Sequence, residues 1–439
     1  MPTTVVAIDF GATSIRVCRV ALGDGPPQLD IVHRHAHEPV VGIDGVLRWD
    51  WCRLLEEMDR GLALATAHGD VASIGVDTWA VDYGLLDERG ALIAAPVSYR
   101  DPRTDGYGRV VDDLGADHLF ATTGLQLQPF TTIFQLDAHD PSELGRARHL
   151  VLLPELVVHH LTGTITAERT SAGCTGLLDI STGRWSPELA AAAGIGLDLL
   201  PAIQVAGTPV GAWRGIPVHL VGGHDTASAV AAMGPATGPG TAFASAGTWL
   251  LLGREQPHPD LSPGAQAANF TNELGVHGGV RFLRNLTGAW LLERCRPAWG
   301  DPPVGELLAA AGALAPGPTV DVTDPAFLHP KDMVVAITRS AGLPVDAHPD
   351  ALVRCIVDSL ALGTATVLDQ LGGVTDLQIF GGASQWDPLR ERIGELAGVP
   401  VRRGPIEATA LGNALVQGIA LGLYEDLQDA RHQLDEVPG

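Results

Sequence analysis

The chain has 439 residues, 46% of them hydrophobic, and a formal net charge of −23 at pH 7. This length predicts two to three domains, and the negative charge argues against nucleic acid or an anionic membrane as a partner, because both need a basic face. No membrane span or secretory signal is predicted, and five scattered cysteines without a CxxC pair indicate reduced thiols in a cytoplasmic protein.

The first predicted element is a hairpin, VVAIDFGATSIRVCRV, in which two apolar strands flank a Gly-Ala-Thr-Ser turn. Gly11 permits a positive φ and a close backbone approach. Consecutive N–H groups in such a turn can hold phosphate oxygens, and Asp9 could hold magnesium directly or through water. The alternative is a plain hairpin, since the GxxxxGK[ST] pattern is missing. The phosphate contacts would come from Ala12, Thr13, Ser14 and Arg16.

The segment HRHAHE follows at residues 33–38 and places three histidines at alternate positions. On a strand they would share one face, so a metal site is conceivable. No HExxH pattern accompanies them, and a solvated strand edge is the favoured interpretation.

Later segments alternate between strand and helix patterns, which predicts α/β layers. We expect strands over residues 72–76, 81–86, 217–221 and 377–380, and helices over residues 54–67, 227–233, 351–371, 388–397 and 408–423.

The stretch VHLVGGHDTASAV, residues 218–230, joins an apolar strand to a helix through two glycines and a His-Asp pair. One interpretation is local, with Asp225 capping the helix. The other is chemical: Gly222 and Gly223 admit a ligand, and Asp225 accepts a proton. Both roles of Asp225 are compatible, because the helix dipole keeps a carboxylate ionised.

A second hairpin, TAFASAGTWLLLG (residues 241–253), carries Gly247 and Thr248 at its tip and follows a Gly- and Pro-rich segment, ATGPGT. The late stretch LQIFGGASQWDPL places Gly381 and Gly382 between a strand and a helix, which suits a nucleotide or a tight turn. The two similar hairpins predict two related domains around a cleft, residues 1–236 and 237–439.

With these elements in this order, the sequence resembles the sugar kinases of the FGGY family, which share the architecture of actin and the heat-shock chaperone ATPases. The resemblance covers nearly the whole chain. It implies an α/β fold with two related actin-like ATPase (ribonuclease H-like) domains around a central cleft, the first for sugar and phosphate and the second for the nucleotide. The stretches that carry it are GVDTWAVDYGLLDERG, PVSYRDPRT, TGLQLQPFTTIFQL, GGHDTASAV, SAGTW, NFTNELG, RNLTGAWLLER and GPIEATALGN.

The resemblance also implies a role for particular residues, with ATP and Mg²⁺ as cofactors. Asp225 matches the catalytic base and Asp9 the magnesium-linked aspartate. The sugar contacts implied are Ala80, His224, Asp225, Thr226 and Asn285. The nucleotide contacts implied are Ala12, Thr13, Ser14, Ile15, Arg16, Thr248, Glu293 and Gly382. The sugar pocket would further include Asp77, Thr78, Trp79 and Asp82, with Gln126 and Thr131 at its wall, although Trp79 equally suits a core position.

The sequence departs from the family pattern at four positions. Ala80 and Ile15 stand where glycines are frequent, Glu293 where a glutamine often meets the nucleotide, and Trp386 where asparagine is common. The methyl group of Ala80 narrows the expected pocket and leaves the choice of sugar open.

The expected activity is ATP-dependent phosphorylation of a ketose, L-rhamnulose to L-rhamnulose 1-phosphate. The alternatives are a kinase for another ketose such as L-fuculose or L-xylulose, a non-catalytic sugar sensor on the same scaffold, and an actin-like ATPase that binds proteins. The expected partners are a small sugar and ATP, not nucleic acid or a membrane, and the expected state is a cytoplasmic monomer or homodimer.

Overall fold

The structure is a computed structural model that describes residues 2–23, 25–67, 69–234, 238, 240–328 and 330–434. The chain divides into two compact units. The first consists of Met1–Pro235, Glu255–Phe282 and Thr409–Pro438, and the second mainly of Ala236–Arg254 and Leu283–Ala408. The predicted assignment of residues 1–236 to the sugar and residues 237–439 to the nucleotide stays a prediction.

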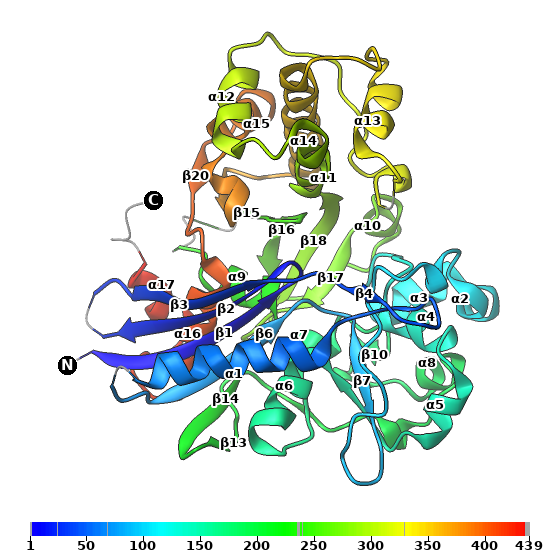
Figure 1. Cartoon of the computed structure of the whole chain (residues 1–439), viewed down its shortest axis with the longest axis vertical. Coiled ribbons are helices and arrows are strands. Elements are labelled where there is room, and N and C mark those ends of the chain that lie inside the picture. Colours follow the sequence, from blue (N-terminus) through cyan, green and yellow to red (C-terminus); the bar gives the residue numbers. More distant parts are fainter. Residues whose placement is uncertain are drawn as a thin grey trace. The chain divides into compact units, whose positions relative to one another are not determined.

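A six-stranded sheet organises the first unit (Figure 1). Three of its strands form an antiparallel meander from β1 through β2 to β3, and β6 and β14 continue the sheet in parallel with β1 on its other side. The strand order is β13 (Pro209–Trp213), β14 (Ile216–His224), β6 (Ser73–Thr78), β1 (Thr3–Gly11), β2 (Ser14–Leu22) and β3 (Gln28–Ala36).

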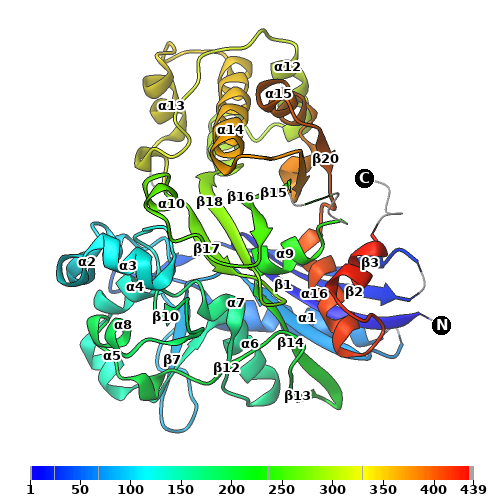
Figure 2. The ribbon, with the colours of Figure 1, turned by 180° about the vertical axis from the view of Figure 1, so that it is seen from behind.

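Helices cover both faces of this sheet. Helix α1 (Trp51–Ala67) packs on the face that carries Val6, Ile8 and Phe10, side chains that are fully buried (Figure 1). Helices α9 (Asp225–Ala231) and α16 (Ala408–Ala420) lie on the opposite side, as seen from behind in Figure 2. Because side chains alternate along a strand, Asp9 faces away from α1.

The other elements of the first unit are short. The strands are β4 (Val40–Val41), β5 (Leu47–Arg48), β7 (Tyr83–Leu86), β8 (His149–Leu152), β9 (Ala167–Glu168), β10 (Leu178–Asp179), β11 (Arg184–Trp185), β12 (Ile203–Gln204) and β17 (Thr271–Leu274). The helices are α2 (Gly108–Leu114), α3 (Ala116–Thr123), α4 (Thr132–Asp137), α5 (Pro141–Arg146), α6 (Leu153–Thr162), α7 (Arg169–Ala172), α8 (Pro187–Ala192), α10 (Pro263–Ala267) and α17 (Leu427–His432).

The second unit repeats the pattern of the first sheet. Its strands follow the order β18 (Val280–Thr287), β16 (Trp249–Gln256), β15 (Thr241–Ala246), β19 (Asp376–Phe380) and β20 (Val401–Arg403). The β15–β16 hairpin is antiparallel, β19 runs parallel to β15, and β20 runs parallel to β19, as β2, β6 and β14 do around β1. The helices are α11 (Trp290–Cys295), α12 (Val304–Gly312), α13 (Met333–Ala341), α14 (Pro349–Leu371) and α15 (Asp387–Ala397).

Helix α14 is long and apolar enough to cross a membrane by length and composition, the one such helix among the described residues. Of its most apolar window, 67% is buried inside the protein, as in the core helix of a soluble protein. The five cysteines are free thiols, four of them buried and Cys52 exposed, which agrees with the predicted reduced state.

Candidate active site

Three aspartates gather where the parallel strands of the first unit end. Asp9 on β1 and Asp77 on β6 are register partners, and Asp225 directly follows β14. Arg16 Nη1 donates to Asp9 Oδ2 at 2.7 Å, and Asn413 Nδ2 of α16 donates to Asp77 Oδ2 at 2.6 Å. Among the described residues, the buried Oδ1 of Asp77 has no hydrogen-bond partner.

The three carboxylates lie close enough to repel one another, and two of them, Asp9 and Asp77, are buried. Burial and the charges of Asp9 and Asp225 raise the pKa of Asp77 well above its usual value, although the hydrogen bond from Asn413 acts in the opposite direction. A bound cation would remove this repulsion, and hard divalent ions prefer carboxylate oxygens. The free oxygen of Asp77 and its charged neighbours therefore fit a magnesium ion.

Asp225 is the most accessible of the three acids. Its side chain is 27% exposed, and the Thr226 hydroxyl donates to its Oδ1 at 3.1 Å. Helix α9 begins at Asp225, and His224 occupies the cap position. The local interpretation of Asp225 as the helix cap is therefore wrong by one position, but the first turn still favours a carboxylate through the helix dipole.

The two glycines before Asp225 accommodate the protein itself. A Cβ at Gly222 would lie 2.9 Å from the backbone nitrogen of Ser228, and one at Gly223 would lie 2.5 Å from Ser171 Oγ. Glu168 is also close to this point, and its Oε2 accepts the N–H of Gly223 at 3.0 Å. Packing, rather than the approach of a ligand, thus requires glycine at these positions.

Glu168 also holds His224, the residue after Gly223, through Thr170. Its Oε2 accepts the Thr170 hydroxyl at 2.5 Å, and Thr170 Oγ1 in turn accepts the N–H of His224 at 3.2 Å. The carboxylate of Glu155 lies on the other side and accepts the N–H of Glu168 at 2.9 Å. A buried pair of acids therefore anchors the segment that carries Asp225.

The ring of His224 is held by three buried side chains. Its Nδ1 lies 3.4 Å from Cys174 Sγ, 3.4 Å from Glu273 Oε2 and 3.2 Å from Arg281 Nη2, and its Nε2 lies 3.3 Å from Asp225 Oδ1. Burial favours the neutral ring, but Cys174 and Glu273 together raise the pKa of His224 to about 10. A charged imidazole 3.3 Å from Asp225 Oδ1 would attract that carboxylate.

Cys174, His224 and Glu273 could also hold a metal by distance, since their ligand atoms lie within 4.8 Å of one another. The guanidinium of Arg281, however, lies 3.1 Å from Glu273 and already supplies the positive charge.

Most of the predicted sugar-pocket residues are buried. Trp79 is 5% exposed, and its ring centroid lies 4.3 Å from that of Trp49 with the two ring planes tilted by 45°, so it is a core residue. The buried carboxylate of Asp82 is fully engaged within the protein. It accepts hydrogen bonds from the indole N–H groups of Trp49 and Trp79, the backbone N–H of Tyr99 and the side-chain amide of Gln135. The remaining predicted wall residues, Thr78, Gln126 and Thr131, are also buried.

Between Trp79 and Asp82 the backbone is strained. Val81 has a φ of 71°, which is rare for a β-branched residue. Its carbonyl oxygen accepts the Thr132 hydroxyl at 2.7 Å, and this contact holds the conformation. Such strain tends to gather at functional sites, and the neighbouring Ala80, two residues after β6 ends, is partly exposed.

The predicted nucleotide residues lie in both units. In the first, Ala12 and Thr13 form the turn between β1 and β2, whereas the Ile15 side chain is fully buried and offers only its backbone. Those of the second unit are Thr248 at the β15–β16 turn, Glu293 on α11 and Gly382 after β19; the predicted sugar contact Asn285 lies on β18.

Two details of the second unit bear on those predictions. A Cβ at Gly381 would lie 2.9 Å from the carbonyl oxygen of Ala246, so the chain needs glycine there, whereas the space beside Gly382 is open. Glu293 is half exposed and pairs with Arg296 at 2.9 Å, and Trp386 is buried.

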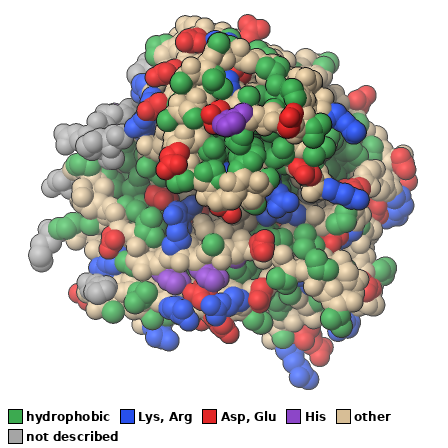
Figure 3. Space-filling model, turned by 45° about the horizontal axis from the view of Figure 1, so that its top comes forward, with side chains coloured by type: hydrophobic (Ala, Val, Ile, Leu, Met, Phe, Trp, Pro, Cys, Tyr) green, Lys and Arg blue, Asp and Glu red, His purple; other side chains and the backbone are tan. Residues whose placement is uncertain are grey.

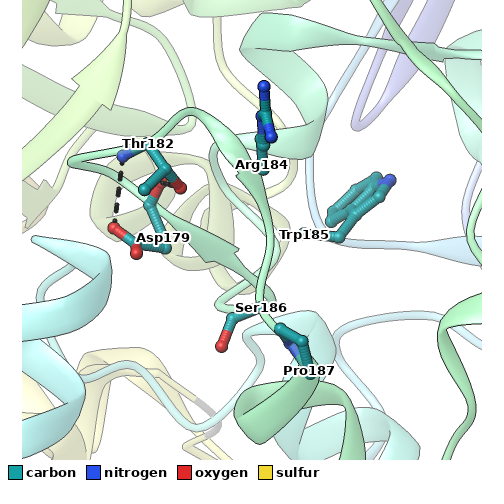
Figure 4. A pocket seen from close by; sticks show the side chains of 6 residues that line it. All are labelled: Asp179, Thr182, Arg184, Trp185, Ser186 and Pro187. Carbon is teal, nitrogen blue, oxygen red and sulfur yellow. Dashed lines mark hydrogen bonds between the residues drawn. The ribbon is translucent and has the colours of Figure 1, made fainter.

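A surface hollow lies on the β10–β11 hairpin and has no residue in common with this site (Figure 4). Asp179 turns back in it to accept the N–H of Thr182 at 3.4 Å. On the face drawn in Figure 3, acidic and basic side chains are interspersed. The hollow is lined by Asp179, Thr182, Arg184, Trp185, Ser186 and Pro187.

Sequence reasoning missed the residues that support the site. Glu168 and Glu273 stand in the stretches AERTSAGC and NFTNELG, where no spacing relates them to Asp225. Asn413 lies 336 residues from its partner Asp77.

Comparison with known proteins gives consistent matches over the whole chain. The models of the FGGY family of carbohydrate kinases match residues 4–231 (N-terminal domain) and 242–421 (C-terminal domain). A rhamnulokinase from Bacteroides thetaiotaomicron is 36% identical over 98% of this chain and 93% of its own length. One from Pectobacterium carotovorum is 39% identical over 98% and 90%, respectively.

Solved structures agree on the fold. A xylulose kinase from Lactobacillus acidophilus superposes with a TM-score of 0.79 at 16% identity and covers 98% of this chain and 91% of its own. A glycerol kinase from Plasmodium falciparum with ADP gives 0.77 at 15% identity, with coverage of 100% and 93%. The predicted two-domain α/β fold is confirmed.

Proposed function

The chain belongs to the FGGY family of carbohydrate kinases and is a sugar kinase, and from this premise we propose that it phosphorylates L-rhamnulose with ATP to give L-rhamnulose 1-phosphate and ADP. The observation that carries the choice of sugar is the likeness to curated rhamnulokinases over 98% of the chain. The structural neighbours that act on xylulose or glycerol are much less similar in sequence.

In this proposal Asp225 is the general base. It accepts the proton of the sugar's C1 hydroxyl while that oxygen bonds to the γ-phosphorus, and the bond from the γ-phosphorus to the bridging oxygen breaks to release ADP. The partial exposure of Asp225 and the imidazole 3.3 Å from its Oδ1 support this role. His224 and Thr226 would hydrogen-bond sugar hydroxyls, with Ala80 and Asn285 as further contacts.

Asp9, with the buried Asp77 beside it, would hold magnesium. The ion, when bound, neutralises charge on the phosphates. Support comes from the unpartnered Oδ1 of Asp77 and the repulsion between the acids. We expect Asp9→Asn to raise the magnesium concentration for half-maximal activity by about tenfold or more. An unchanged magnesium dependence would remove Asp9 from the metal site.

The nucleotide contacts remain those of the sequence, with two refinements from the geometry. Ile15 would act through its backbone alone, and Glu293 would have to leave its ion pair with Arg296 to meet a nucleotide. The proposed contacts are Ala12, Thr13, Ser14, Ile15, Arg16, Thr248, Glu293 and Gly382. A cytoplasmic location and a monomeric or homodimeric state stay predictions.

The deciding experiment is ADP release from magnesium-ATP across L-rhamnulose, L-fuculose, L-xylulose, L-ribulose, D-xylulose and glycerol. A preference for L-rhamnulose supports the proposal, and a preference for another ketose changes the substrate but not the mechanism. Nucleotide binding without turnover of any of them would favour the sugar sensor instead.

A second measurement tests the base. We expect Asp225→Asn to lower kcat by about 10²–10⁴-fold and to bind sugar within a few-fold of the original affinity. Asp112→Asn, at an exposed carboxylate on α2, is the matched control and should retain full activity. Near-normal turnover by Asp225→Asn would remove the base assignment.

A further inference from the structure

The three alternate histidines after β2 do not form one metal-binding face. His33 Nε2 lies 2.9 Å from Glu57 Oε2, and His35 lies 4.0 Å from the same carboxylate on α1. His37 stands just after the end of β3 and turns elsewhere, toward the turn between β1 and β2. The favoured interpretation of a solvated strand edge therefore does not explain the contacts of His37.

His37 contacts the turn twice. Its backbone N–H donates to the carbonyl oxygen of Thr13 at 2.9 Å, and its Nε2 lies 3.0 Å from the carbonyl oxygen of Gly11. The carbonyl between these two, that of Ala12, accepts from Arg100 Nη2 at 3.4 Å. Three successive carbonyl groups of the turn are thus engaged by donors from outside the hairpin.

The protonation state of His37 suits this contact. Burial lowers the pKa of His37 to about 4, so the ring is neutral near pH 7. Its Nδ1 is buried and has no hydrogen-bond partner among the described residues, which assigns the proton to Nε2. The centroid of the His37 ring lies 5.5 Å from that of Trp49 and 5.8 Å from that of Trp79, so these core residues fix the orientation of the ring.

Through peptide geometry, these contacts set the direction in which the N–H groups of the turn point. A trans peptide group is planar and points its N–H opposite to its C=O. With the carbonyls of Gly11, Ala12 and Thr13 held by His37 and Arg100, the N–H groups that follow them in the chain point away from these two donors. A row of N–H groups facing one way is the arrangement that binds anions.

In the second unit, backbone N–H groups hold the carbonyl groups of the corresponding hairpin turn. The carbonyl oxygen of Gly247 accepts the N–H of Ala289 at 2.9 Å, and that of Thr248 accepts the N–H groups of Gly288 at 3.2 Å and Trp290 at 3.3 Å. These donors follow β18, which lies next to β16 as β3 lies next to β2. In both units, the residues after the strand that neighbours the hairpin's second strand hold the hairpin turn.

We propose that His37, assisted by Arg100, is a positioning residue that holds the Gly11–Ser14 turn in the orientation needed to bind the phosphates of ATP. The inference rests on the proposed function, in which this turn binds phosphate. His37 and Arg100 would not contact the phosphates themselves but would orient the backbone N–H groups of the turn that do.

Two substitutions of His37 separate the hydrogen bond from packing. His37→Phe keeps a ring against the tryptophans and removes the donor. His37→Gln removes the ring and keeps a donor nitrogen four bonds from Cα, as Nε2 is. One hydrogen bond contributes about 0.5–1.5 kcal/mol, so we expect His37→Phe to weaken ATP binding about 3–10-fold, whereas His37→Gln stays within about twofold of the original.

The readouts are the dissociation constants of ATP and adenosine by calorimetry, and the KM values for ATP and sugar. His37→Phe should change the ATP values alone, because adenosine has no phosphate and the turn is not among the proposed sugar contacts. His35→Phe, on the same segment, is the control and should bind ATP normally. If ATP and adenosine weaken together, or if His37→Gln is the weaker binder, packing explains the effect and the inference is wrong.

Failure of the two proposals can be told apart. A protein that binds ATP but phosphorylates no ketose contradicts the proposed function, while the binding comparison still tests His37. If His37→Phe does not fold, Arg100→Met removes the donor to Ala12 and should show the same selective loss for ATP. Unchanged ATP binding in Arg100→Met would then overturn the inference.

Discussion

The buried acid pair behind the active-site segment predicts that one neutralising substitution stabilises the protein. Glu155 and Glu168 are each 1% exposed, and Glu155 Oε2 and Glu168 Oε1 have no hydrogen-bond partner among the described residues. Burial, and then the charge of Glu168, raise the pKa of Glu155 well above its usual value. Glu155→Gln keeps the carbonyl that accepts the N–H of Glu168 and removes the ionisable group.

The sign and size follow from linkage. Above its unfolded pKa, Glu155 loses its proton in the unfolded chain but retains it in the folded one, so stability falls as pH rises until the folded pKa is passed. Each pH unit in that interval costs about 1.4 kcal/mol. Glu155→Gln should therefore be more stable at pH 7 by at least about 1.4 kcal/mol, or about 2 °C in Tm, and its advantage should vanish near pH 4.

The assay is Tm by calorimetry or fluorescence at half-unit steps from pH 4 to pH 8, for the original protein, Glu155→Gln and the exposed control Glu88→Gln. The control should show no trend with pH. A variant that is less stable than the original at pH 7, or a difference that does not grow with pH, would show that Glu155 is ionised and satisfied in the folded protein, and the reasoning from burial would fail.

Two further predictions concern packing and charge. Glu273→Gln leaves the buried guanidinium of Arg281 uncompensated and should destabilise by about 3–5 kcal/mol, much of which the double variant with Arg281→Met should recover in chemical unfolding; an additive double variant contradicts this. Gly412→Ala places a Cβ 1.7 Å from the carbonyl oxygen of Ser228 and should cost about 3 kcal/mol or more, whereas Gly305→Ala on α12, with nothing within 4 Å, should be neutral or stabilising; equal Tm values for both would refute the contact.

The local sequence pattern predicted the helices and strands well, because hydrophobic periodicity and turn residues depend on only a few neighbouring positions. The helix expected over residues 54–67 is α1 (Trp51–Ala67), and that over residues 388–397 is α15 (Asp387–Ala397). The strand expected over residues 217–221 continues to His224, because Gly222 and Gly223 fit where Ser171 and Ser228 come close. That extension moves Asp225 from the helix cap into the first turn.

The sequence by itself determined that this is an α/β protein with two similar hairpins, each with glycine and hydroxyls at its turn, and that an aspartate follows a buried strand at the start of a helix. Those properties depend on residues that are neighbours in the chain. Only the tertiary structure decided the state of the groups around that aspartate. Asp77 meets Asn413 across 336 residues, Glu155 becomes a buried acid beside Glu168, and His37 reaches the first turn. Burial and distant charges set pKa values and hydrogen-bond partners, and these arise only when segments far apart in sequence pack together.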